Sequence, residues 1–282
     1  MHPELTIPLI GAEIKAYTLF TVLGALAFAA AALPPLKRAG VKPLRALALL
    51  AVMALAFLTG ARLWNVAVNP GAYAAFKWYS LRLAGFSMYG GVLGSALVLF
   101  AWARLSRTPL LPLLDAIVVP AALAFALARA GCYLNGCCCG VITSSAWGVR
   151  FPEKNNAQDL ISGLLPLIGI QLQANRYPTQ LFELAFALLG LVPALVFGRR
   201  LISGSKFLLY GAWFSAMRFA ILPLRSLPYD DFVIRAFYPA LYLTLTVLGA
   251  AALILINKKE FSPYSGEQRP HPSTSPPDLH YE

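Results

Sequence analysis

Seven long apolar runs constrain the fold of this chain more than any other feature of its sequence. They cover approximately residues 17–34, 46–68, 84–104, 110–131, 178–198, 207–225 and 236–256. Each run is close to the ~20 mostly apolar residues that one helix needs to cross the hydrocarbon core of a bilayer, or exceeds them. The runs are apolar on all sides and lack the alternation that is typical of barrel strands. The sequence therefore predicts an all-α membrane protein with seven transmembrane helices.

The composition agrees with a polytopic membrane protein. The chain is 59% hydrophobic and only 12% charged, whereas soluble domains carry about 25% charged residues. Its formal net charge of +11 could indicate nucleic acid as a partner, but the basic residues are scattered and mostly flank the apolar runs. This placement is typical of topology determinants, so we expect the bilayer and not nucleic acid as the partner.

The basic residues also predict an orientation across the membrane. They concentrate in the segments after the first, third, fifth and seventh runs, while the alternate segments are poorer in net positive charge. By the positive-inside rule, the amino terminus and residues 132–177, the one long ordered loop, lie outside, and the carboxyl terminus lies in the cytoplasm. Within that loop, residues 160–172 are too short and too interrupted by Gly and Pro to span, and read as a re-entrant or interfacial segment.

The chain divides into two parts at its carboxyl-terminal end. Residues 1–259 are expected to form a single polytopic membrane domain. Residues 260–282 are rich in Pro and Ser, and a segment of this composition cannot bury enough apolar surface to fold. We therefore predict a disordered cytoplasmic tail.

Five polar residues on five predicted helices share one layer of the membrane. With the predicted orientation, Arg62, Tyr89, Arg129, Glu183 and Arg218 all fall in the outer leaflet. Ionisable residues inside a span are costly and usually face the bundle interior, which makes each a candidate for the functional site. The exception is Asp115, near the cytoplasmic end of its run, where structural pairing or capping is expected.

Arginines at this depth point to an anionic lipid group. A guanidinium stays charged, forks onto pairs of phosphate oxygens and sheds water readily, so a phospholipid phosphodiester is the natural ligand. For Arg62 or Arg225 alone, snorkelling to the interface or pairing with a carboxylate explains the residue equally well. For Arg129 and Arg218 together, the small number of acidic partners favours anion binding.

The segment RAGCYLNGCCCG, residues 129–140, places four cysteines within eight residues. A structural zinc site usually pairs Cys-x-x-Cys with a second half elsewhere, and the chain has only three histidines, all in its terminal segments. No metal site is predicted on this basis. The favoured interpretation is that the cysteines are small side chains that fill a helix-to-loop turn. The second is a disulfide between Cys132 and one of Cys137, Cys138 and Cys139, because adjacent cysteines rarely bridge to each other without strain.

An ordered series of motifs resembles the prolipoprotein diacylglyceryl transferase family. The series runs from MHPEL at the start to about Arg225. It consists of KAYTLF, GARL, YGG, LLDAIVVP, RAGCYLNGCCCG, WGVRFP, RYPTQLFE and the Arg218-Phe219 segment. The most specific member is RAGCYLNGCCCG, which is similar to the family signature GRxGNFxNGExxG.

The resemblance implies a fold, a place and a reaction. Members of this family have seven membrane helices with the amino terminus outside and lie in the bacterial inner membrane. They transfer the diacylglyceryl group of phosphatidylglycerol to the lipobox cysteine thiol of prolipoproteins, forming a thioether and releasing glycerol phosphate, with no metal or cofactor. The alternative is a non-catalytic or differently specific lipid-binding paralogue. A transporter is disfavoured, because the polar residues gather in one leaflet.

The resemblance also assigns roles to residues. It implies catalytic roles for Arg129, Arg218, Tyr89 and Tyr17. It implies substrate contacts for Asn135 and Gly140. The outer-leaflet position of Arg62, Gly90, Gly91 and Glu183 makes these four the other candidates for substrate contact. The arginines would bind the phosphate and stabilise the negative charge that develops as it leaves. The paired glycines after Tyr89 would let a helix or a lipid headgroup approach closely.

Four departures from the family pattern affect the chemistry. Many members carry a histidine, in HGG, where this chain has Tyr89. A tyrosine with its ordinary pKa of about 10 is a poor base at neutral pH, so it either transfers a proton in a shifted environment or only orients the lipid. Cys132 and Cys137 replace the first asparagine and the acidic residue of the signature. Leu222 replaces a glutamate that usually follows the late arginine.

Overall fold

The computed structural model describes residues 4–7, 12–73, 86–151, 175–198 and 200–258. Within these ranges it contains seven helical segments long and apolar enough to cross a membrane. This confirms the predicted fold class, while the side of the membrane that each terminus faces stays a prediction. Two predictions fall outside the described residues. They are the re-entrant or interfacial segment at 160–172 and the disordered tail at 260–282.

The first four spans are single helices. They are α1 (Ala16–Arg38), α2 (Pro43–Val68), α3 (Met88–Ser106) and α4 (Leu110–Leu134). The first helix extends four residues beyond its predicted end because it continues through Pro34 and Pro35. The fourth continues three residues beyond its predicted end, so that it carries Cys132 in its last turn and reaches the edge of the 135–140 turn.

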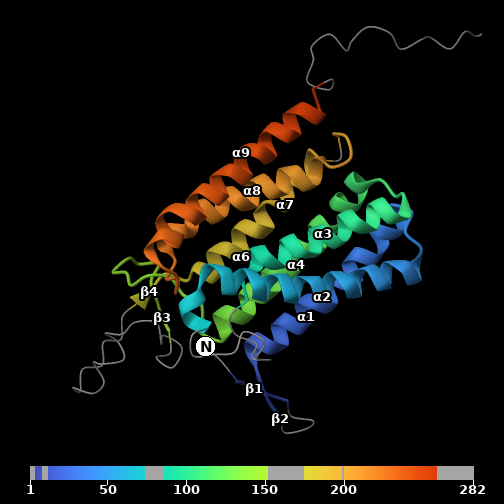
Figure 1. Cartoon of the computed structure of the whole chain (residues 1–282). Helices are drawn as coiled ribbons and strands as arrows, with labels where there is room; N and C mark the ends of the chain where they lie inside the picture. Colours follow the sequence, from blue (N-terminus) through green and yellow to red (C-terminus); the bar gives the residue numbers. More distant parts are fainter. Residues whose placement is uncertain (1–3, 8–11, 74–85, 152–174, 199, 259–282) are drawn as a thin grey trace, which may run out of the picture.

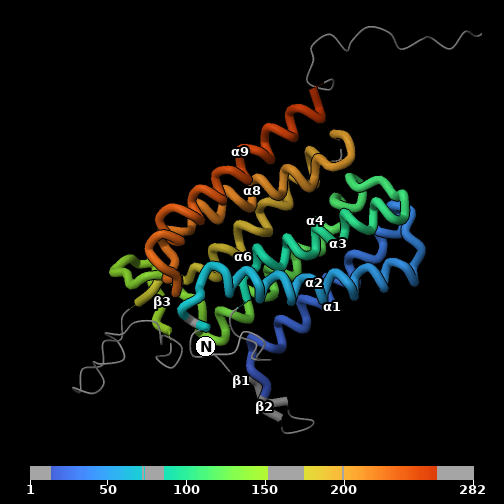
Figure 2. The backbone as a smooth tube through the Cα atoms, in the orientation of Figure 1, coloured from blue at the N-terminus to red at the C-terminus, as the bar shows by residue number. Residues whose placement is uncertain are grey.

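The last three spans are irregular. The fifth consists of α6 (Thr179–Leu189) and α7 (Leu191–Val196), which meet at Gly190. The sixth is α8 (Ser205–Ile221) followed by the short 3-10 helix η4 (Leu222–Leu224). The seventh begins with a π-helical turn, η5 (Val233–Phe237), and continues as α9 (Tyr238–Ile256). The backbone tube follows these helices along one bundle, with α8 and α9 side by side (Figure 2).

Small residues let the helices approach each other closely. A Cβ added at Gly90 on α3 would lie 2.2 Å from the carbonyl oxygen of Gly60 on α2, and one at Gly94 would lie 2.4 Å from that of Ala56. On the neighbouring pair, a Cβ at Gly24 of α1 would lie 3.0 Å from the carbonyl oxygen of Ala124 on α4. Such contacts are typical of membrane helices, whose association depends on close van der Waals contact.

The lipid-facing surface and the interior differ as a membrane protein requires. Large apolar side chains such as Leu26, Leu55, Leu97 and Leu248 are exposed on the outside of the helices. Inside, Asp115 on α4 accepts hydrogen bonds from the backbone N–H groups of Gly204 (2.8 Å) and Phe207 (3.0 Å) at the start of α8. Asp115 thus caps α8, as the sequence predicted.

Two small antiparallel ladders, which the sequence did not predict, lie at one end of the bundle (Figure 1). One pairs β1 (Glu4–Ile7) with β2 (Ala12–Lys15), and the other pairs β3 (Val149–Arg150) with β4 (Asn175–Arg176). A bridge between Gly140 and Arg225 lies at the same end. These contacts join the connections between spans and bring distant segments of the chain to one place.

Candidate active site

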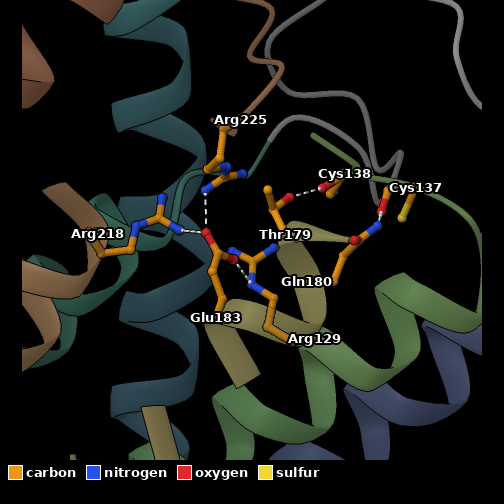
Figure 3. Close-up of polar contacts among 8 residues, drawn as sticks. All are labelled: Arg129, Cys137, Cys138, Thr179, Gln180, Glu183, Arg218 and Arg225. Carbon is orange, nitrogen blue, oxygen red and sulfur yellow. Dashed lines mark hydrogen bonds and ion pairs between the residues drawn. The ribbon is translucent and has the colours of Figure 1, made fainter. Parts of the chain in front are cut away.

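A buried carboxylate, Glu183, binds three arginines at once. Its Oε2 lies 2.7 Å from Nε of Arg129, and its Oε1 lies 2.9 Å from Nη1 of Arg225. Nη1 of Arg218 also donates a hydrogen bond to Oε1. The four side chains converge from different directions (Figure 3). The Glu183 side chain is 1% exposed and the three arginines are 8–13% exposed, so the cluster is nearly enclosed by protein.

Each member of this arginine cluster comes from a helix or helix end at the ladder-bearing end of the bundle. Arg129 lies in the second-to-last turn of α4, Glu183 lies in the second turn of α6, and Arg218 lies in the last turn of α8. Arg225 follows directly after η4, which turns the chain back toward α6. Because α4 packs on α6 and α6 packs on α8, the three arginines reach the one carboxylate from both sides.

The arginine cluster carries excess positive charge. Three guanidiniums face one carboxylate, which leaves a net charge of +2 in a site shielded from water. An uncompensated buried charge is costly, and its cost falls when an anion binds. The sequence-based expectation that Arg129 and Arg218 have few acidic partners is therefore corrected in part, since both bind Glu183. The excess charge still favours an anionic ligand.

Two buried donors beside the arginine cluster have no hydrogen-bond partner among the described residues. They are Nε of Arg218 and the hydroxyl of Tyr89, both buried. The Tyr89 ring packs against Tyr242, with centroids 5.3 Å apart, and the Arg218 guanidinium lies over the Tyr242 ring at 5.8 Å. The Tyr89 hydroxyl also interacts electrostatically with Arg218. Buried donors without partners are expected to meet a ligand oxygen.

The first turn of α6 fixes the turn formed by residues 135–140. Nε2 of Gln180 donates to the carbonyl oxygen of Cys137 (2.7 Å), and Oγ1 of Thr179 donates to that of Cys138 (3.2 Å). Figure 3 shows these two contacts beside the arginine cluster. Thr179, Gln180 and Glu183 lie on one face of α6, since residues three and four apart are neighbours on a helix. The same helical turn therefore positions both the carboxylate and the turn.

Gly140 lies where several segments of the site meet. Its N–H donates to the carbonyl oxygen of Tyr177 (2.8 Å), and its own carbonyl oxygen accepts from Nη1 of Arg176 (3.3 Å). A Cβ at this position would lie 2.3 Å from the carbonyl oxygen of Leu224, on the segment that carries Arg225. Only glycine allows this approach of two backbones. The structure thus gives Gly140 a role in shaping the site, and its predicted contact with substrate stays a prediction.

Replacing Gly140 by alanine should destabilise the protein. The added methyl group would push the Leu224 backbone away, and overpacking of this kind costs about 1–3 kcal/mol. The midpoint of thermal unfolding in detergent measures the effect. Gly211 on α8 is the matched control, because an added Cβ there meets no atom within 4 Å, and alanine in a helix gains about 0.5–1 kcal/mol over glycine. Equal shifts for the two variants would contradict this role.

Tyr17 and Asn135 lie beside the cysteines. Tyr17 is in the first turn of α1, and its phenol interacts electrostatically with the thiols of Cys132 and Cys138. Asn135 is the C-cap residue of α4, and its N–H donates to the carbonyl oxygen of Gly131 (3.0 Å). Both residues therefore lie at the same end of the bundle as the arginine cluster, and their assigned roles stay predictions.

Arg62, Gly90 and Gly91 belong to the α2–α3 side of the bundle. The Arg62 guanidinium lies 4.7 Å from the centroid of Phe86 and 3.5 Å from the hydroxyl of Tyr73, which donates to Oδ1 of Asn65 (2.7 Å). Gly90 and Gly91 lie against α2, where an added Cβ would collide with Gly60 and Phe57. Of the two uses predicted for the glycines, helix approach is observed, and lipid contact stays a prediction.

Sequence reasoning did not assign site roles to Arg225, Thr179, Gln180 or Tyr242. Arg225 follows Arg218 by seven residues, a spacing that would place both on one face of a continuous helix, and this signal could have found it. Gln180 and Thr179 lie three and four residues before Glu183, a second usable signal. Tyr242 offers no such signal, because it belongs to a largely apolar helix without charged residues.

The charges of the arginine cluster also act on the thiol of Cys138, which lies outside the membrane-spanning helices. Hydrogen bonds from the thiols of Cys132 and Cys137 lower the pKa of the Cys138 thiol well below its ordinary value, and the charges of Arg129 and Arg225 lower it further. Burial lowers the pKa of Arg225, against the opposing effect of Glu183. The guanidinium nevertheless stays charged at neutral pH, because its ordinary pKa is above about 12.

Comparison with known proteins points to one family. A family model described as prolipoprotein diacylglyceryl transferase matches residues 5–257. A phosphatidylglycerol–prolipoprotein diacylglyceryl transferase of Tropheryma whipplei is 25% identical over 209 residues, which cover 71% of this chain and 70% of the relative. One from Clostridium perfringens is 30% identical over 186 residues (65% and 67%), and one from Dehalococcoides mccartyi is 30% identical over 168 residues (59% and 56%).

Proposed function

We propose, from the premise that this chain belongs to the prolipoprotein diacylglyceryl transferase family, that it transfers the diacylglyceryl group of phosphatidylglycerol to a prolipoprotein thiol. The relatives' names support this substrate pair. The seven apolar spans support a multi-pass membrane protein as the carrier of the reaction. We further propose the bacterial inner membrane as its location and the lipobox cysteine as the acceptor.

The observation that carries the proposal is the +2 excess charge of the arginine cluster. In the proposed reaction the thiolate attacks the glycerol carbon that bears the phosphate ester. A sulfur–carbon bond forms, the carbon–oxygen bond breaks, and glycerol phosphate leaves as a dianion. The leaving group thus gains one negative charge over the phosphodiester. Fixed positive groups in a water-poor site stabilise such developing charge more in the transition state than in the bound lipid.

Each arginine has donors left after binding Glu183. A guanidinium carries five N–H donors, and each contact with the carboxylate uses one of them. The unpartnered Nε of Arg218 is one such donor within the buried cluster. We propose that Arg129, Arg218 and Arg225 bind the phosphate oxygens through these free donors, while Glu183 fixes the orientation of the three guanidiniums.

Tyr89 is proposed to contact the same phosphate. Its buried hydroxyl has no partner among the described residues and lies in the electrostatic range of Arg218. Replacing Tyr89 by phenylalanine removes only this hydroxyl. If the hydroxyl takes part in proton transfer, the variant loses turnover entirely; if it only orients the lipid, we expect activity to fall by about 10-fold or less, in line with one neutral hydrogen bond of about 0.5–1.5 kcal/mol. Single-turnover transfer rates distinguish the two, and unchanged activity would exclude both roles.

Transfer by the purified full chain tests the proposed function. The protein in detergent with phosphatidylglycerol vesicles receives a peptide that carries a lipobox cysteine, and mass spectrometry detects the thioether product. The parallel experiment in cells is restoration of lipidation in a strain depleted of its own transferase. A stably inserted chain that binds phosphatidylglycerol without transferring the diacylglyceryl group would replace this proposal with the alternative of a non-catalytic, lipid-binding paralogue.

A further inference from the structure

The structure brings three of the four cysteines together in a way the sequence did not predict. The sulfur atoms of Cys132, Cys137 and Cys138 all lie within 4.8 Å of one another. Cys132 comes from the last turn of α4, and the other two come from the turn that follows it. When the thiol, imidazole and carboxylate groups of the described residues are compared, these three sulfurs are the ones close enough together to share one metal ion.

We propose that Cys132, Cys137 and Cys138 form a three-thiolate site for a soft metal ion, with Cu(I) as the ion it fits best. At a metal–sulfur distance of about 2.3 Å, three sulfurs in a trigonal arrangement lie about 4 Å apart. The sulfurs here lie within 4.8 Å of one another, so they need to move only slightly closer to bind one ion. Thiolates are soft ligands and select soft ions such as Cu(I) and zinc. Three sulfurs can satisfy Cu(I), whereas zinc takes a fourth ligand in its structural sites.

The backbone around these sulfurs is fixed in a shape that turns the thiols toward each other. Cys138 has a φ of 63°, in the left-handed region that residues other than glycine rarely adopt, and Gly136 two residues earlier has a φ of 71°. The carbonyl groups of Cys137 and Cys138 are bound by Gln180 and Thr179. The N–H of Cys137 donates to the carbonyl oxygen of Cys132 (3.1 Å). A strained residue that its neighbours fix in place is typical of functional sites.

Access and charge also suit a metal ion. Cys138 is exposed, Cys137 is half-buried and Cys132 is buried. An ion can therefore reach the site from the surface at Cys138. Arg129 and Arg225 both interact electrostatically with Cys138. Three thiolates and a monovalent ion carry a net negative charge, and nearby guanidiniums lower the cost of gathering it. Figure 3 shows Cys137 and Cys138 beside the arginine cluster that supplies this charge.

Competition for Cu(I) tests the site on the full chain in detergent, reduced and without oxygen. We expect the wild type to take one Cu(I) per chain from a chromophoric Cu(I) chelator, and zinc to bind more weakly. Cys132→Ser, Cys137→Ser and Cys138→Ser should each lose more than the roughly 10–100-fold in affinity that loss of an outer-shell partner costs. Cys139→Ser is the matched control and should bind as the wild type does. Absence of binding, or equal losses in all four variants, would overturn the proposal.

A second measurement uses only the wild type and so does not depend on how the variants fold. Bound Cu(I) should protect Cys137 and Cys138 from alkylation by a maleimide, as read by peptide mass spectrometry. Unchanged labelling would overturn the proposal. A disulfide between Cys132 and Cys137 or Cys138 in the chain isolated without oxygen would overturn it too. Such a disulfide lowers the mass of the chain by two hydrogens relative to the reduced form.

The metal site and the transferase function fail separately. We expect the variant with serine at Cys137, Cys138 and Cys139 to keep its transferase activity, because the proposed reaction uses the thiol of the substrate and no thiol of the enzyme. The same variant should lose Cu(I) binding. The expected result is therefore loss of Cu(I) binding alone. Loss of transfer with retained Cu(I) binding would contradict the claim that the reaction uses no thiol of the enzyme.

Discussion

Replacing Arg218 by alanine is expected to lower the rate of diacylglyceryl transfer by about 10³-fold. Arg218 is 8% exposed, binds Glu183 and keeps its Nε free of any partner among the described residues. Its loss removes both a positive charge and a donor from the site where the leaving phosphate becomes a dianion. The rate is measured with phosphatidylglycerol vesicles and a lipobox peptide, under single-turnover conditions so that chemistry and not product release is observed.

The Arg218→Ala variant should still fold, which makes the loss of activity interpretable. Glu183 keeps Arg129 and Arg225 as partners, and the excess charge of the cluster falls from +2 to +1. Arg218→Lys should recover part of the rate, since lysine restores the charge without the planar fork. Arg235 is the matched control, because its side chain is 78% exposed and pairs only with Asp231 at 3.3 Å among the contacts seen. A rate for Arg218→Ala near that of Arg235→Ala would exclude Arg218 from the chemistry.

Replacing Glu183 by glutamine should produce the largest loss of stability. The amide keeps the shape of the side chain but leaves three buried guanidiniums, Arg129, Arg218 and Arg225, without their shared counter-charge. Removing one partner of a buried ion pair costs about 3–5 kcal/mol. We expect the midpoint of thermal unfolding in detergent to fall strongly and transfer activity to fall with it, because the guanidiniums lose their common orientation.

A second substitution distinguishes this electrostatic role from simple loss of shape. In the double variant Glu183→Gln with Arg225→Gln, one of the unpaired charges is gone, so part of the lost stability should return. The two single variants and the double variant form a double-mutant cycle, and we expect a coupling free energy within the 0.5–3 kcal/mol typical of residues in contact. Strictly additive losses would show that repulsion among the arginines is not the cause. Added phosphatidylglycerol should also stabilise the wild type more than either single variant.

The cluster also explains how a chain with few acidic residues can bury several arginines. Glu183 sits on the face of α6 that meets both α4 and α8, and one carboxylate has enough acceptor sites for three donors. The first turn of that helix fixes the 135–140 turn through Gln180 and Thr179 as well. Substitutions in RYPTQLFE are therefore expected to affect both the arginines and the cysteine-bearing turn.

Several features were predictable because they depend on local sequence or on depth alone. The seven spans follow from the length and hydrophobicity of the runs. Their bounds differ by up to four residues, at the end of α1, which continues through two prolines, and at the start of α3. Arg129, Arg218 and Glu183 could be singled out as candidates from the sequence, because ionisable residues stand out in apolar helices. The capping role of Asp115 followed from its place near a helix end. The ladders β1–β2 and β3–β4 were missed, since strands of two to four residues have too few positions to show a period.

The sequence by itself determined that this chain has seven helices long and apolar enough to cross a membrane and which family it belongs to, because these depend on hydrophobicity and motif order. Only the tertiary structure decided that Arg129, Arg218 and Arg225 share one carboxylate, and that Cys132, Cys137 and Cys138 meet at their sulfur atoms. Glu183 is 35 and 42 positions from Arg218 and Arg225. Contacts over such separations depend on how each helix is rotated and crossed against its neighbours, and residue depth leaves that rotation open.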